Sequence, residues 1–337
     1  MPLQLTRSDV LAFRRSVGAL DERRAPGSDA LRRAAWAGLQ DSTPRSALLS
    51  LHARLTGVTS DAWEDPALVQ VWGPRFSAYV VHAADRAVFT VGRLPVDARR
   101  RAETQALADR LEDWLGGEAA TYGAAGRGLG VAPNSLRYAA PTGRVLIRWD
   151  GARQPVVRMV PPPDVDPAEA RLELARRYLH VFAPGTPEGF ASWAGVRPRA
   201  AVATVEALRD ELTPVRTAVG DGWILAADEP ALRAPDGSPA HVRLLPSGDA
   251  FTLLQGVDRE LLVPDAGRRA QLWTPRVWPG AVLVGGEVVG TWRRAGGVVT
   301  IAAWTTLSRE DRDAVEAEAT SLPLPDALTV TVRWAES

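Results

Sequence analysis

The sequence lacks cysteine and lysine, and it has no long run of apolar residues. The absence of cysteine excludes disulfide bonds and thiolate metal sites. The absence of lysine excludes a Schiff base on a lysine side chain and the phosphate-binding lysine of a P-loop. No stretch reaches the roughly 18 apolar residues of a membrane helix, and the N-terminus lacks the apolar core of a signal peptide. We therefore expect a soluble protein of the cytoplasm, with no membrane partner.

Histidine is scarce as well, and the four residues are scattered along the chain as His52, His82, His180 and His241. None forms the closely spaced pair that is typical of a zinc site on a helix. We expect no metal site and no cofactor.

The charge is balanced over the whole chain but uneven along it. The formal net charge is zero, and every basic residue is an arginine. Residues 122–160 contain six arginines and one acid, whereas residues 161–255 contain nine arginines and thirteen acids. A zero total can therefore conceal a basic face that suits an anionic partner.

The clearest unit spans residues 164–235. Asp166-Pro167 and Thr186-Pro187 are typical helix starts, and a third helix follows in the stretch RPRAAVATVEALRDEL, with Val202 among its expected inward residues. A hairpin is expected next, around Gly220-Asp221-Gly222. Three helices followed by a hairpin predict a winged helix, whose third helix is the one able to enter a DNA groove.

Two earlier units, residues 1–94 and 95–163, have the same outline of helices followed by extended segments. In the first, LVQVWGPRFSAYVVH and AVFTVGRL are expected to be extended, after a helix in SALLSLHARL. In the second, Pro141-Thr142-Gly143 is expected to be the turn of a wing, with Arg144, Leu146 and Arg148 on one strand face.

Residues 236–337 change character, because short strand-like segments such as HVRLLP, AFTLLQG and GGVVTIAAW alternate with glycine turns. One late helix is expected after Ser308. The predicted fold is α+β: three tandem winged-helix domains followed by a small antiparallel C-terminal β-barrel.

These features alone leave the function open between DNA binding and protein interaction. Winged helices serve both purposes, and an arginine-bearing strand face is usually only solvated. Most tryptophans fall within strand or helix patterns, which favours core packing over base stacking.

Several stretches resemble a known family, the winged-helix DNA glycosylases of the AlkZ/YcaQ type. They include GLQDSTPRSALLSLHARL, ARLELARRYLHVFAPGTPEGFASWAGV and VLVGGEVVGTWRR. The resemblance implies three winged helices around a concave DNA-binding face, backed by a β-barrel. It also implies excision of alkylated bases, including bulky adducts and interstrand crosslinks.

The resemblance also implies the site. Members carry Gln-x-Gln or Gln-x-Asp where this chain has Gln40-Asp41-Ser42, so Gln40 matches the first position and Ser42 stands at the second. A second family segment, Arg-x-Thr-x-His, reads here as Arg75-x-Ser77-x-Tyr79. We expect Gln40 and Asp41 to be catalytic. We expect the DNA-binding residues to be Ser42, Arg75, Ser77, Arg127, Arg137, Arg144, Arg148, Arg197 and Arg199.

The chemistry asks for a group that holds a water molecule and stabilises positive charge at C1′ of the sugar. A carboxylate such as Asp41 can do both, whereas Gln40 can only position the water. The alternative is structural: Thr43 caps a helix with Pro44 at its first position, and Gln40 and Asp41 only solvate the turn.

We predict a monofunctional glycosylase that hydrolyses the N-glycosidic bond with water. The expected partner is double-stranded DNA carrying an alkylated or crosslinked base, bound by a monomer associated with the nucleoid. The alternative function is a non-catalytic winged-helix DNA-binding protein, a regulator or a protector of damaged DNA.

Overall fold

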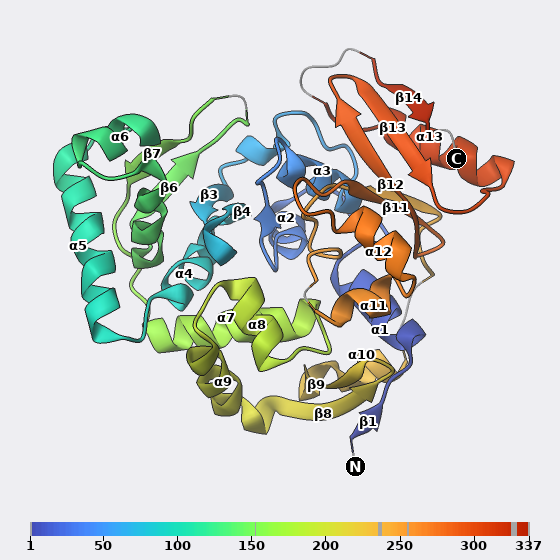
Figure 1. The fold of residues 1–337 in the computed structure, drawn as a ribbon, viewed down its shortest axis with the longest axis horizontal. Helices are drawn as coiled ribbons and strands as arrows, with labels where there is room; N and C mark the ends of the chain where they lie inside the picture. The colour runs from blue at the N-terminus through green and yellow to red at the C-terminus, as the bar shows by residue number, and fades with distance from the viewer. Residues whose placement is uncertain (1, 152, 235–237, 255, 325–328, 336–337) are drawn as a thin grey trace.

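The structure is a computed structural model that describes residues 2–151, 153–234, 238–254, 256–324 and 329–335. Its helices and strands form a mixed α+β fold with three sheets in the described residues. In Figure 1 the residues around α2 (Ser28–Ala34) and α3 (Ser46–Arg54) lie at the centre, with the other parts of the chain around them. The N-terminus lies at the bottom of that view and the C-terminus at the upper right.

The largest sheet has six strands in the order β2-β4-β3-β6-β7-β5. Three come from the first predicted unit and three from the second. The strands are β2 (Leu39–Gln40), β3 (Leu68–Trp72), β4 (Ala78–His82), β5 (Ala120–Thr121), β6 (Val145–Arg148) and β7 (Val156–Met159). The two units expected at residues 1–94 and 95–163 therefore share one sheet.

The two halves of this sheet join where β3 meets β6, and Gln70 pairs there with Ile147. The Gln70 side chain extends the junction beyond the ladder. Its Nε2 donates to Asp41 Oδ2 at 2.9 Å and to the Trp149 carbonyl at 3.1 Å, and its Oε1 accepts from the Trp149 amide at 2.6 Å. The buried Gln70 carboxamide thus pairs with the amide and the carbonyl of Trp149, as a neighbouring strand would, at the point where β6 ends.

The helices of the first two units cover this sheet. They are α4 (Arg86–Phe89), α5 (Ala98–Leu115) and α6 (Tyr122–Gly128), together with the short 3-10 segments Ala83–Asp85, Val91–Arg93 and Pro133–Thr142. Two strand predictions are therefore wrong. The stretch AVFTVGRL is helical, and Pro141-Thr142-Gly143 ends a 3-10 segment, whereas the β6–β7 hairpin is paired from Arg148 and Val156 inward.

The third unit contains α7 (Pro167–Val181), α8 (Pro187–Ala194), α9 (Pro198–Ala207) and the hairpin of β8 (Leu212–Thr217) and β9 (Gly220–Leu225). Asp166 and Thr186 cap their helices as predicted. The strand β9 begins at Gly220, so the hairpin turns just before the predicted glycines. Val202 is 51% exposed, so its predicted inward position on α9 is wrong.

The N-terminal segment belongs with this third unit in space. Strand β1 (Leu3–Gln4) pairs in parallel with β8, and α1 (Arg7–Val17) packs against α7, α10 (Glu229–Arg233) and α11 (Asp258–Leu262). Arg14 fastens α1 there, because its guanidinium donates to the carbonyls of Phe182 and Ala183. The structure therefore places the first residues of the predicted unit 1–94 beside residues 164–235.

The C-terminal strands form an open sheet rather than the predicted barrel. The order is β10-β11-β12-β13-β14, from β10 (Val242–Leu245) through β11 (Gly280–Val284), β12 (Glu287–Ala295) and β13 (Val298–Ala303) to β14 (Thr331–Trp334). The edge strands β10 and β14 do not pair with each other in the described residues, and β14 runs parallel to β13. The sheet is mixed, and α13 (Arg309–Thr320), capped by Ser308 as predicted, packs against β10 and β14.

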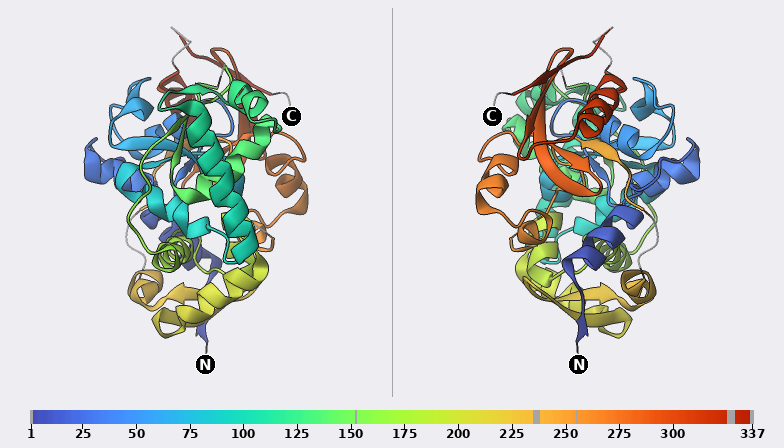
Figure 2. Two further views of the ribbon diagram at one scale, coloured as in Figure 1. Left: turned by 90° about the vertical axis from the view of Figure 1, so that its left-hand side faces the viewer. Right: turned by 90° about the vertical axis from the view of Figure 1, so that its right-hand side faces the viewer.

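Between β10 and β11 the chain leaves this sheet and returns to the centre of the molecule. It forms α11 and α12 (Ala266–Leu272), and Phe251, Leu253 and Leu254 enter the main hydrophobic core. Residues 250–254 of the predicted strand AFTLLQG are turns and coil, whereas Gln255 lies outside the described residues. In the side views of Figure 2 the orange helices lie to one side of the C-terminal strands, and the Trp304 indole, which follows β13, donates to Gln271 of α12 at 2.9 Å.

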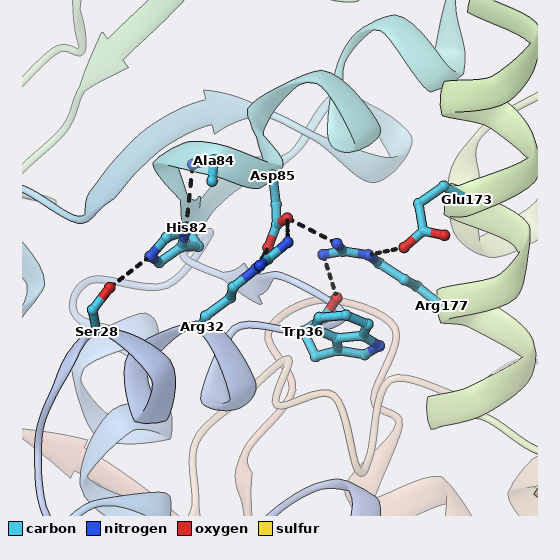
Figure 3. Close-up of polar contacts among 8 residues, drawn as sticks. All are labelled: Ser28, Arg32, Trp36, His82, Ala84, Asp85, Glu173 and Arg177. Atoms are coloured by element: carbon cyan, nitrogen blue, oxygen red, sulfur yellow. Dashed lines mark hydrogen bonds and ion pairs between the residues drawn. The ribbon is translucent and has the colours of Figure 1, made fainter. Parts of the chain in front are cut away.

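A network of charged side chains joins the central helices to the third unit (Figure 3). Arg177 of α7 is 2% exposed, donates to Asp85 at 2.8 Å and to Glu173 at 2.9 Å, and stacks on Trp36 at 4.0 Å. Arg32 of α2 donates to both oxygens of Asp85. Although burial opposes it, the two guanidinium groups hold the pKa of Asp85 below its ordinary value.

None of the described helices is both long enough and apolar enough to cross a membrane.

We expect Gln70→Leu to lower the free energy of unfolding by about 2 kcal/mol, because Asp41 and the Trp149 backbone lose their partner in a buried position. Urea unfolding measures the change. The matched control is Gln105→Leu on α5, since Gln105 makes no side-chain hydrogen bond within the described residues. Equal effects of the two substitutions would show that the junction does not contribute specifically.

Candidate functional site

The predicted motif lies at the end of β2 and in the turn that follows. Leu39 is buried in the core, and alternation along the strand places Gln40 on the opposite face, where it is half-buried. Gln40 pairs with Tyr79 of β4, and the Asp41 amide donates to the Ala78 carbonyl at 2.8 Å. The sheet therefore fixes the backbone on both sides of the Gln40 side chain.

The Gln40 carboxamide is oriented by Arg75. The Arg75 Nη2 donates to Gln40 Oε1 at 2.6 Å, and the Tyr79 hydroxyl lies 3.4 Å from the same oxygen. On another side the chain passes closely at Gly248, where a Cβ atom would lie 3.2 Å from Gln40 Nε2. Gly248 also has a φ of +77°, which residues with a side chain rarely adopt, so the backbone conformation favours glycine there and the space for a Cβ is tight.

Arg75 and Phe76 form the tight turn between β3 and β4 in an uncommon conformation. Their φ values are 54° and 58°, a left-handed region that residues with a side chain rarely adopt. The Ser77 amide closes this turn on the Pro74 carbonyl at 3.1 Å, and Gly195 at the end of α8 packs against it, since a Cβ there would lie 2.9 Å from Arg75 Cα. Strained residues of this kind concentrate at functional sites.

Asp41, the second predicted catalytic residue, faces the interior. It is 2% exposed, its Oδ1 accepts from the Ala47 amide at 3.0 Å, and its Oδ2 accepts from Gln70. It thus satisfies an amide in the first turn of α3, whose N-cap residue is Arg45 with a φ of 66°. The prediction that Thr43 caps this helix is wrong, because the chain reaches it through a longer turn and Asp41 acts from further upstream.

Burial raises the pKa of Asp41 to about 6, against the hydrogen bond from the Ala47 amide, which lowers it. The carboxylate is removed from water, and two neutral donors do not replace its hydration. Asp41 is therefore a titrating group directly behind Gln40.

A buried ion pair holds the Gly248 loop. Arg54 of α3 donates to both oxygens of Asp249 at 2.7 and 2.9 Å, and Ser50 donates to Asp249 at 2.7 Å. Arg54 is 2% exposed and Asp249 1%. This pair connects the loop after β10 to the same helix that follows the Gln40 turn.

The residues predicted to bind DNA are not all available at the surface. Arg144 is engaged by Asp109 at 2.5 Å and by Glu112 of α5, and Leu146, expected on the same solvated face, is 3% exposed. The predicted arginine-bearing face of β6 is therefore wrong, because β6 is an inner strand covered on both faces. Arg148 contacts Glu64 at 2.9 Å and stacks on Trp63 at 4.3 Å.

The other predicted DNA-binding residues lie in different places. Arg137 donates to Asn134 at 2.8 Å, whereas Arg127 is exposed on α6. Ser42 is exposed in the Gln40 turn, and Ser77 is half-buried after Arg75. Arg197 and Arg199 are exposed at the start of α9 and line a cleft of about 1410 Å³.

Two residues near Gln40 were not found from the sequence. Gly248 is one glycine among 29 and carries no local signal. Arg93, 5% exposed, donates to the carbonyls of Ala194 and Trp72 and lies over the Phe76 ring at 4.4 Å. Burial lowers the pKa of Arg93 to about 9. No sequence motif predicts the position of Arg93, because packing between segments distant in the sequence determines it.

The model of the family described as "DNA glycosylase AlkZ-like" matches residues 33–323. The chain belongs to the AlkZ-like DNA glycosylase family. The resemblance inferred from the sequence is thereby confirmed, and the family places the chain among DNA-binding repair enzymes. No curated protein matches the chain.

A solved structure supports the same fold. The Streptomyces sahachiroi DNA glycosylase AlkZ superposes with a TM-score of 0.77 at 17% sequence identity, over 99% of this chain and 100% of that chain. At this identity the likeness concerns the fold, and it confirms the mixed α+β architecture.

We expect wild-type stability to fall relative to Asp41→Asn as the pH rises from about 4 to above 6. Because the pKa is raised, the folded state favours the neutral Asp41 carboxyl. Above pH 6 its ionisation lowers the free energy of unfolding by about 3 kcal/mol. Below about pH 4 the carboxyl is neutral in both states, and this lowering disappears. Urea unfolding of both proteins between pH 4.5 and 7.5 measures this difference. A difference that does not change with pH would contradict a raised pKa at Asp41.

Proposed function

We propose that the protein is a monofunctional DNA glycosylase that hydrolyses the N-glycosidic bond of alkylated bases with a positioned water molecule. The observation that supports this best is the Gln40 carboxamide, half-buried at the end of β2 and oriented by Arg75. The family supports a DNA glycosylase role, and the fold agrees with it. We propose in addition the positioned water, the alkylated base and the roles of the residues.

The chemistry needs little acid catalysis, because a purine alkylated at N7 or N3 already carries positive charge and leaves readily. What remains is to place a water molecule and to tolerate charge developing at C1′. Arg75 and, at a longer distance, the Tyr79 hydroxyl both donate to Gln40 Oε1, so the two amide hydrogens are what Gln40 chiefly offers to water. The guanidinium thus fixes the direction in which the carboxamide points.

In this proposal Asp41 supports catalysis and does not attack. Its two oxygens are engaged with Ala47 and Gln70, and its exposure of 2% keeps it away from a bound nucleotide. It holds the start of α3 and the sheet junction, and through them the backbone that presents Gln40. Asp41 is therefore assigned as a positioning residue.

The proposed partner is double-stranded DNA with an alkylated or crosslinked base, bound by a monomer in the nucleoid. Among the residues predicted to bind DNA, Arg127, Arg197 and Arg199 are exposed and are in no ion pair within the described residues, so phosphate contacts would come from them. Arg144 is less suited, since two carboxylates already neutralise it.

A second function, binding of damaged DNA without excision, is favoured by one specific observation. The position where the family carries Gln or Asp holds Ser42, which is exposed, and the neighbouring carboxylate of Asp41 faces inward. The site then has an amide but no accessible carboxylate. A chain that had lost excision while keeping its fold would have this arrangement.

We expect Gln40→Ala to lower the single-turnover rate of base release from duplex containing N7-methylguanine by about 100-fold, with little change in melting temperature. Release of free base is measured by chromatography, and abasic sites by strand cleavage on heating in alkali. The matched control, Gln105→Ala on α5, removes a carboxamide that has no assigned role in the site and leaves the rate within about threefold.

The glycosylase proposal fails if the wild-type protein releases neither small nor bulky N7 adducts above background. It fails for Gln40 alone if wild type is active and Gln40→Ala is equally active. A large loss of melting temperature in Gln40→Ala would assign a structural role to this side chain.

A further inference from the structure

A second feature lies beside the Gln40 site, in the cleft of about 1410 Å³ between the third and second units. Its walls are residues 93–97, the first turns of α5 and α7, and the face of α9. In Figure 1 these segments meet at the lower left, where α5 descends towards α9. Phe76 closes one end of the cleft, and it directly follows Arg75, which holds Gln40.

The cleft is basic. Five arginines and two acids line it, which leaves an excess of three positive charges, and the arginines are Arg93, Arg100, Arg171, Arg197 and Arg199. Both acids are engaged elsewhere. Asp97 accepts from the Arg100 amide at the start of α5, and Glu103 pairs with Arg99 at 3.0 Å. The charge of Glu103 is offset by Arg99, whereas Asp97 keeps its negative charge, so the lining retains an excess of positive charge.

Arg93 adds a donor that lacks a partner. It is 5% exposed, and its Nε and Nη1 donate to the carbonyls of Ala194 and Trp72. Its Nη2 is buried with no hydrogen-bond partner in the described residues, and it lies beside Gly195, another lining residue. A buried charged donor left unpaired is costly, so an anionic acceptor is the group that this position lacks.

The rest of the lining is apolar and aromatic. Tyr138 is 53% exposed and packs edge-to-face on Phe76, with ring centroids 5.0 Å apart, and Val96 is 57% exposed. Leu107, Leu172 and Val196 also line the cleft. A duplex keeps its bases stacked inside and presents phosphates, so it would leave such a surface unused, whereas a strand with unstacked bases covers aromatic faces and basic groups together.

We propose that this cleft binds a single-stranded segment of DNA, with a phosphate at Arg93 and a base stacked on Tyr138. This inference rests on the proposed function for its ligand, since DNA is the partner. It adds that the strand is opened beside the lesion. Phe76 lines the cleft and the preceding Arg75 holds Gln40, so a strand in the cleft would reach the turn that orients the Gln40 carboxamide.

The test measures, by fluorescence anisotropy over a series of salt concentrations, binding of the full chain to a labelled oligothymidine of twelve nucleotides and to a duplex of twelve base pairs. We expect Tyr138→Ala to weaken oligothymidine binding about tenfold, through loss of one stacked base, and to change duplex binding little. Tyr138→Phe keeps the ring and retains the affinity. Tyr138 is exposed, so these variants are expected to fold, which circular dichroism and thermal melting verify.

Arginine variants complete the design. Arg100→Ala with Arg199→Ala should weaken oligothymidine binding and its dependence on salt, whereas Arg309→Ala on α13 should not. Arg309 is 95% exposed at the start of α13, which Figure 1 shows on the opposite side of the molecule from α5 and α9, so its removal controls for the loss of surface charge elsewhere. The proposal is overturned if Tyr138→Ala leaves oligothymidine affinity unchanged. It is also overturned if single-strand and duplex affinities fall by the same factor, which would make the cleft part of a duplex-binding face.

Excision separates this proposal from the function on which it rests. If wild type releases the base and Tyr138→Ala does not change oligothymidine binding, only the proposal of single-strand binding in the cleft is refuted. If oligothymidine binding depends on Tyr138 but no base is released, the glycosylase proposal is refuted and the proposal of single-strand binding in the cleft stands.

Discussion

The contact of Gln70 with Asp41 and Trp149 is the constraint on which the centre of the molecule depends. The two halves of the six-stranded sheet meet at one paired position, Gln70 and Ile147, and the Gln70 side chain adds the remaining hydrogen bonds. Because the same side chain holds Asp41, the junction also sets the face on which β2 presents each residue. With Asp41 held inside, alternation directs Gln40 to the other face. The orientation of the site thus follows from the joining of two sheets.

Arginine connects the remaining parts of the chain. A guanidinium is planar and weakly hydrated, and its fork can satisfy carboxylates and backbone carbonyls at once, so it can be buried where a lysine ammonium would be poorly matched. In this lysine-free chain each such residue bridges segments far apart in sequence: Arg14, Arg54, Arg93 and Arg177. Burying ion pairs costs desolvation that the Coulomb attraction only partly offsets, so their main effect is to specify the arrangement. Counting arginines therefore overstates the surface available to DNA.

The parts of the fold that could be predicted from the sequence carry their signals locally. Asp166 and Thr186 start helices because a side-chain oxygen next to a proline satisfies a free amide in the first turn. Positions that depend on distant segments could not be predicted. Strand β1 pairs with a strand more than two hundred residues away, and Leu146 is buried because other elements cover both faces of β6. An open sheet and a barrel have the same strand pattern, so alternation alone could not distinguish them.

The candidate site also contains residues that could be predicted from the sequence and residues that could not. Gln40 was found through its place in a family motif. The local sequence alone did not identify it, because the turn that follows could equally be a helix cap. Asp41 was expected beside it, but a carboxylate that satisfies the first turn of α3 cannot also face a nucleotide. Arg93 and Gly248 carry no signal in the sequence, because packing alone brings them near Gln40.

An amide without an accessible carboxylate has a chemical consequence for the proposed reaction. A carboxylate could offset the positive charge that develops at C1′, whereas Gln40 contributes only a dipole, whose oxygen is already partly engaged by the cationic Arg75. The driving force must then come from the lesion itself. Bases made cationic by alkylation leave readily once water is positioned, while neutral bases would also need protonation by a general acid. On this chemistry the site selects its substrates by the charge of the leaving base, and the surrounding protein needs only to hold the strand and the water in place.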